Sequence, residues 1–79
     1  MTLSMTVYDY LVTGVEPEMV LEAEAPSDVG AWRDAVMLVS EIMREKPVLE
    51  SGSFTVKVEV KTQAGRPVCC VEARSQNGC

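Results

Sequence analysis

Hydrophobic and polar residues alternate with a period of two in three segments of this chain, residues 19–25, 54–61 and 68–74, which is typical of β-strands that bury one face. Residues 5–12 are rich in β-branched and aromatic side chains and predict a fourth strand. The strand at 54–61 is the clearest, with apolar positions at Phe54, Val56, Val58 and Val60. The strand at 19–25 is expected to be half-buried, with Met19, Leu21, Ala23 and Ala25 on its inner face.

One longer segment has the period of a helix, with apolar residues three and four positions apart. It predicts a helix over residues 28–46, with Ser27 as N-cap and Asp28 complementing the helix dipole in the first turn. Pro47 cannot continue the helix. The expected buried stripe, which places the tryptophan in the core, is Val29, Trp32, Ala35, Val36, Val39, Ile42 and Met43.

Breaker residues at 13–18 and 63–66 predict two hairpin turns. The expected fold is therefore α+β with the order ββαββ, a four-stranded antiparallel sheet with one helix packed on one face. The connections favour a sheet in which the strand at 19–25 lies at one edge and the strand at 68–74 at the other. The chain is short enough for one domain, predicted as residues 1–74 with a frayed tail at 75–79.

The strand at 5–12 has two mixed faces, and the cost of burying an unpaired carboxylate decides between them. Burying Asp9 beneath the helix without a partner would cost several kcal/mol. Its neighbours Tyr8, Tyr10 and Val12 are therefore expected to face the helix. The open face of the sheet then carries a candidate dimer surface formed by Val7, Leu11, Val20 and Cys70.

Charge is distributed unevenly along the chain. The first 32 residues carry a formal charge of -6 and no basic side chain, whereas the rest carries +1, for a net charge of -5. Such a field attracts basic partners and disfavours direct contact with nucleic acid or an anionic membrane. The predicted partner-binding residues are Asp9, Glu16, Glu18, Glu22, Glu24 and Asp28. The alternative is that these carboxylates only keep a small domain soluble.

The residue types present leave little catalytic chemistry. There is no histidine, so a Ser or Cys nucleophile has no imidazole partner, and we expect no enzyme, no metal site and no cofactor. Cys69 and Cys70 are adjacent in a strand and should point to opposite faces, so they and Cys79 are expected to be reduced thiols. The weaker alternative is a Cys70 thiol activated by Lys57 or Arg74.

The segment Ala25-Pro26-Ser27-Asp28-Val29-Gly30-Ala31 follows an acidic hairpin and opens a helix that contains alanine and methionine. In this order the chain resembles, over residues 6–46, small phage-encoded anti-CRISPR proteins. The resemblance implies a single acidic domain without an active site that blocks a CRISPR surveillance complex at its basic DNA-recognition surface. The chain departs from that pattern by adding a second hairpin and the adjacent Cys69 and Cys70.

Two further resemblances point elsewhere. The chain resembles small bacterial ββαββ domains of unknown function, and its helix and second hairpin resemble dodecin-like flavin binders. Dodecins, however, begin with one strand before the helix and carry a stacking tryptophan that the hairpin of this chain lacks.

We therefore expect an acidic protein-interaction inhibitor, a monomer or homodimer whose partner is a basic protein or ribonucleoprotein complex. The absence of a basic leader or a long apolar run predicts a cytoplasmic protein without a membrane contact, inside the bacterial host if it is phage-encoded. The alternative is a homo-oligomeric protein that binds a small, flavin-like molecule on the open sheet face.

Overall fold

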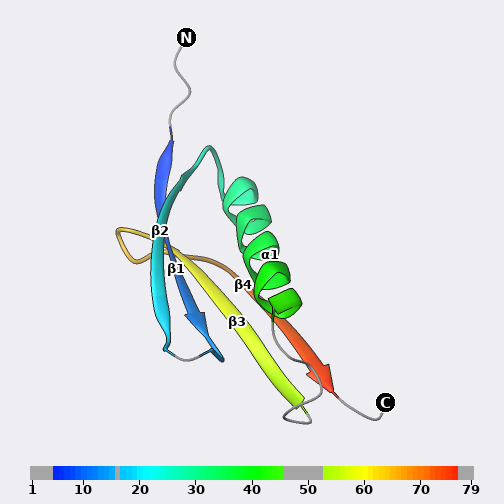
Figure 1. Cartoon of the computed structure of the whole chain (residues 1–79). Helices are drawn as coiled ribbons and strands as arrows, with labels where there is room; N and C mark the ends of the chain where they lie inside the picture. Colours follow the sequence, from blue (N-terminus) through cyan, green and yellow to red (C-terminus); the bar gives the residue numbers. More distant parts are fainter. Residues whose placement is uncertain (1–4, 16, 46–52, 77–79) are drawn as a thin grey trace.

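A computed structural model describes residues 5–15, 17–45 and 53–76 and confirms the ββαββ order (Figure 1). The elements are β1 (Thr6–Thr13), β2 (Met19–Ala25), α1 (Asp28–Glu45), β3 (Ser53–Thr62) and β4 (Pro67–Gln76). Because Phe54 pairs with Ser75 and Ser53 with Gln76, β4 includes two residues predicted to lie in the tail. Residues 77–79 lie outside the described residues, as do Lys46 and Pro47, where the helix was predicted to end.

The four strands form one antiparallel sheet in the order β2-β1-β3-β4, as predicted. A register shift between Val60 and Lys61 marks a bulge where β3 meets the start of β4. β1 pairs with β3 only from Lys57 to Thr62, so the far end of the β3–β4 hairpin extends past β1. The molecule is accordingly elongated, with principal extents of 51 × 21 × 17 Å.

The core lies between the helix and the sheet, and most of its buried strand residues come from the central strands β1 and β3. The predicted orientation of β1 is confirmed, since Tyr8, Tyr10 and Val12 are buried and Asp9 is only partly so. The remaining buried apolar residues are Ala25 on β2, Ala31, Ala35 and Val39 on α1, and Val56, Val58 and Val60 on β3. No charged side chain among the described residues is buried.

The predicted buried stripe of the helix is only partly right, because Ala35 and Val39 are buried as predicted but Val29 and Trp32 are not. Val29 and Trp32 are 62% and 48% exposed, whereas Ala31 and Ala35 are fully buried. The small alanines let the helix backbone approach the sheet closely, which the bulkier tryptophan would prevent. The apolar stripe is therefore turned toward one flank of the helix, and Trp32 lies at the surface rather than in the core.

The prediction that β2 is half-buried is wrong. Only Ala25 is buried, and the inward-facing Met19, Leu21 and Ala23 are exposed. One helix about 10 Å wide covers roughly two strands spaced by about 4.8 Å. Here α1 lies mainly over β3 and β4 (Figure 1), so β2 is left largely uncovered.

The local signals at the turns agree with the structure. The Ser27 hydroxyl accepts a hydrogen bond of 3.2 Å from the Gly30 N–H, which confirms the predicted N-cap. In the β3–β4 turn, the N–H groups of Gly65 and Arg66 donate to the carbonyl and the hydroxyl of Thr62. Both turns that were predicted from breaker residues contain a glycine with positive φ.

Candidate functional site

Three carboxylates gather on the open face of the sheet, where β1 runs beside β2. Asp9 and Glu22 are directly opposed in the antiparallel register, and Glu24 lies two residues farther along β2. Because directly opposed residues share a face, Glu22 and Glu24 project on the same side as Asp9. We call Asp9, Glu22 and Glu24 the acidic patch.

The acidic patch makes no ion pair within the part of the chain that the structure describes. Lys61 is the register neighbour of Asp9 on the β3 side, yet the ion pairs found there join Lys57 to Glu59 and Arg66 to Asp28. Like charges that are directly opposed across two strands destabilise a sheet. The repulsion between Asp9 and Glu22 therefore works against folding, and the attraction between Asp9 and the directly opposed Lys61 offsets part of it.

The other predicted acidic residues have different surroundings. Glu18 is exposed and directly precedes β2, so it extends the negative field of the patch along the edge. Glu16 lies outside the described residues. Asp28 is at the start of α1 and faces the helix side of the sheet, where other residues of the chain bind it.

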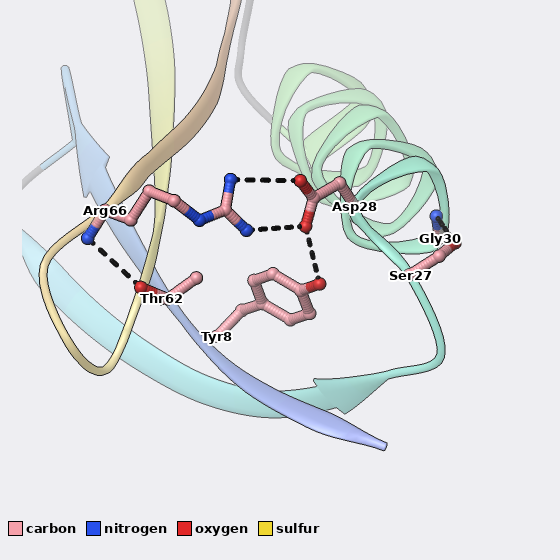
Figure 2. Close-up of polar contacts among 6 residues, drawn as sticks. All are labelled: Tyr8, Ser27, Asp28, Gly30, Thr62 and Arg66. Atoms are coloured by element: carbon pink, nitrogen blue, oxygen red, sulfur yellow. Dashed lines mark hydrogen bonds and ion pairs between the residues drawn. The ribbon is translucent and has the colours of Figure 1, made fainter. Parts of the chain in front are cut away.

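Asp28 is the centre of a polar network that joins three elements (Figure 2). The two terminal nitrogens of Arg66, in the β3–β4 turn, each donate to one carboxylate oxygen of Asp28 at 3.1 Å. The Tyr8 hydroxyl donates to the Asp28 Oδ1 at 2.8 Å. Bidentate pairing of this kind holds a carboxylate in a defined orientation, so the network fixes the helix start against β1 and the turn.

These contacts shift the protonation equilibria of all three groups. Hydrogen bonds from Arg66, and then from Tyr8, hold the pKa of Asp28 below its ordinary value. The hydrogen bond to Asp28 raises the pKa of Tyr8, as does its burial, and the same carboxylate raises the pKa of Arg66. The network is thus intact when Asp28 is ionised and Tyr8 is protonated.

Asp28→Asn should weaken the fold at neutral pH, and the loss should disappear in acid. The folded protein favours the ionised carboxylate, so this stabilisation is present above the ordinary pKa of 3.8 and is lost as the pH falls through the lower pKa of the folded state. The effect should be modest, because solvent screens two largely exposed groups. Urea unfolding between pH 2 and pH 7 measures it.

Glu41→Gln is the matched control for that measurement, because Glu41 is an exposed helix carboxylate outside these contacts. It should leave the free energy of unfolding nearly unchanged. An Asp28→Asn variant whose loss of stability stays the same throughout the acid titration would contradict the assigned role of the ion pair.

The four residues of the predicted dimer surface do not form one continuous apolar patch. Leu11 pairs with Val20 on one side and with Glu59 on the other, and Glu59 in turn pairs with Cys70. Glu59 therefore separates Cys70 from the two aliphatic residues. Val7 lies opposite Glu24, two residues from Asp9. The apolar part of this open face is consequently a small Leu11–Val20 pair beside the acidic patch.

The two described cysteines point to opposite faces, as predicted. Both are free thiols; Cys70 is exposed, whereas Cys69 is half-buried beside the core. Burial raises the pKa of the Cys69 thiol, which disfavours the thiolate. Lys57, one of the two cations considered for activating Cys70, makes an ion pair with Glu59 at 3.0 Å. Cys79 lies outside the described residues.

Two polar features could not be found from the sequence pattern. Arg66 and Asp28 are 38 residues apart, and only the folded chain brings them together. The Tyr10 hydroxyl is buried and has no hydrogen-bond partner among the described residues. The Tyr10 side chain lines a shallow hollow of about 150 Å³ between β2 and α1. The other residues that line it are Leu21, Ala23, Asp34 and Leu38.

Comparison with protein families, with curated protein sequences and with solved structures found no match to this chain. Among the described residues, no helix combines the length and the apolar character needed to cross a membrane. The same residues contain no group of three or more side chains placed to hold a metal ion.

Proposed function

We propose that this chain is a protein-binding domain that uses its acidic patch to contact a basic surface on a larger partner. The observation that carries the proposal is the direct opposition of Asp9 and Glu22, with no compensating ion pair among the described residues. A repulsion that weakens the isolated fold becomes favourable when Lys or Arg of a partner lies between the two carboxylates.

Protection of the sheet edge explains only part of the patch. Glu22 and Glu24 lie on the edge strand β2, where charge discourages pairing with other sheets. Asp9, however, lies on β1, which is paired on both sides and has no free edge. A carboxylate at this internal position does nothing for the edge, which favours a role in binding.

The surroundings of the patch suit a protein partner. Charged groups mainly raise the association rate and select the partner, whereas apolar contacts supply most of the affinity. Leu11 and the 64% exposed Val20 lie on the same face, two residues along each strand from the Asp9–Glu22 pair. A basic protein surface with an apolar centre would use both kinds of contact.

The resemblance of residues 6–46 to anti-CRISPR proteins identifies the first partner to test. In this narrower form of the proposal, the acidic patch occupies the DNA-recognition surface of a CRISPR surveillance complex in the cytoplasm of a bacterial host. DNA binding by a purified complex should then fall as the chain is added.

Charge reversal of the patch tests the proposal. Tagged wild-type protein is incubated with bacterial lysate at low and high salt, and the retained proteins are identified by mass spectrometry. Glu22→Lys/Glu24→Lys should abolish retention of a basic complex that the wild type holds at low salt. The matched control is Glu41→Lys/Glu45→Lys, which changes the net charge equally on the exposed side of α1 and should retain the partner.

Circular dichroism of each variant establishes that the fold is intact. Equal loss of the partner in both double variants would mean that net charge, rather than the acidic patch, governs binding. Retention by Glu22→Lys/Glu24→Lys would contradict the proposal. A large, coloured oligomer in the purified protein would instead favour the flavin-like alternative.

A further inference from the structure

The two edges of the sheet differ in their protection against pairing. β2 carries Glu22 and Glu24 and is followed directly by Pro26, which are features that block strand addition. β4 is the other edge, and beyond its first residue, Pro67, it carries only one acidic and one basic side chain, Glu72 and Arg74. Its outward backbone groups face no further strand of the described sheet.

The side chains along β4 are self-complementary. Glu72 and Arg74 are exposed on the open face of the sheet, and neither makes an ion pair among the described residues. In an antiparallel pair of identical strands, the residue at the two-fold axis meets itself, and its neighbours on either side meet each other. If the pair is centred on Ala73, Glu72 of each copy lies opposite Arg74 of the other copy, which gives two ion pairs.

We propose that two copies of this chain join edge to edge through β4, antiparallel and centred on Ala73. A centre at Glu72 would place the two Glu72 carboxylates opposite each other, and a centre at Val71 would place Glu72 opposite Cys70 without an ion pair. On the helix side, the Ala73 centre brings small or apolar residues together, because Ala73 meets Ala73 and Val71 meets Ser75 of the second copy.

The joined sheet would have eight strands in the order β2-β1-β3-β4-β4-β3-β1-β2. A two-fold axis perpendicular to the sheet keeps both open faces on the same side, so the two acidic patches would face one way. Five strand spacings separate the two β1 strands, which corresponds to roughly 24 Å. For the binding role proposed above, this arrangement gives two contacts to one partner and hence avidity.

Analytical ultracentrifugation of charge-swapped variants tests the dimer without any binding partner, so its outcome is independent of the proposed function. The wild type should be a dimer at micromolar concentration. Glu72→Arg alone, or Arg74→Glu alone, should weaken dimerisation by about tenfold or more, because each converts two attractions into two repulsions. The double variant Glu72→Arg/Arg74→Glu should restore the dimer. In this double variant the two ion pairs form again, with the acidic and basic positions exchanged.

Cross-linking tests the register separately. In a background with Cys69→Ser, Cys70→Ser and Cys79→Ser, Ala73→Cys should form an intermolecular disulfide on oxidation, because the two introduced thiols meet at the axis. Ser75→Cys is the control and should not cross-link, since its counterpart lies four residues away in the register. A wild type that is monomeric at all concentrations, or a dimer indifferent to both single charge changes, would overturn the proposal.

Discussion

Replacing Gly14 with alanine should destabilise the fold by about 2–4 kcal/mol. Gly14 follows β1 with a φ of 88°, a conformation that costs residues with a side chain about 1–2 kcal/mol. A Cβ at this position would also collide with the backbone carbonyl oxygen of Thr55. Since Thr55 belongs to β3 and pairs with Arg74 on β4, its backbone cannot move away without disturbing the sheet.

Gly65→Ala is the matched control, because it separates the strain from the collision. Gly65 has a similar φ of 92°, but a Cβ there meets no atom within 4 Å. We expect it to lose only the conformational part, about 1–2 kcal/mol. Equilibrium urea unfolding of the two variants measures the difference. Equal losses would mean that Gly14 does not approach the Thr55 carbonyl as closely as described.

Removing the hydroxyl of Tyr10 should stabilise the protein, by about 1–2 kcal/mol. The hydroxyl is buried without a partner in the described ranges 5–15, 17–45 and 53–76, and such a group costs about 1–3 kcal/mol because it has lost its hydrogen bonds to water. Burial also raises the pKa of Tyr10, which agrees with poor solvation of the group. Tyr10→Phe keeps the ring and its packing, so the gain should be visible as a higher denaturation midpoint without a change in slope.

Tyr8→Phe makes the same chemical change and should have the opposite effect. The Tyr8 hydroxyl donates to Asp28, and its loss removes one of the contacts that hold the helix start. The two variants therefore control for each other in a single denaturation experiment. A Tyr10→Phe variant that is less stable than the wild type would show that the Tyr10 hydroxyl does have a partner in solution.

The strands and their order could be predicted from the sequence because alternation and connectivity nearly determine them. In β3, Val56, Val58 and Val60 are buried as the period of two requires. The orientation of β1 followed from the cost of burying one carboxylate, Asp9, and the structure confirms it. These predictions depended either on a local pattern of apolar residues or on one large energy, the cost of burying the Asp9 carboxylate.

The placement of the helix depended on packing that the period does not specify. The apolar arc of α1 is wide, and a period of 3.6 does not tell which part of the arc contacts the sheet. Ala31 and Ala35 occupy that contact because they are small, and this displaces Trp32 to the surface. The same placement leaves Leu21 on β2 exposed, which alternation alone would have buried.

The candidate site was predictable in its charge but not in its geometry. The excess of carboxylates before residue 33 is visible in the sequence. The opposition of Asp9 and Glu22, however, depends on the register of β1 against β2, since a shift by one residue would place them on different faces. The pairing of Asp28 with Arg66 likewise exists only after the helix and the last hairpin have docked.

The most direct test of the acidic patch is partner retention by the neutral, nearly isosteric variant Asp9→Asn/Glu22→Gln. The variant relieves the repulsion between Asp9 and Glu22 and also loses the attraction of Asp9 to Lys61, so the free energy of unfolding should change little and unfolding cannot account for a loss of binding. We predict that this variant fails to retain the basic partner that the wild type holds at low salt. Undiminished retention by the folded variant would contradict the proposed function.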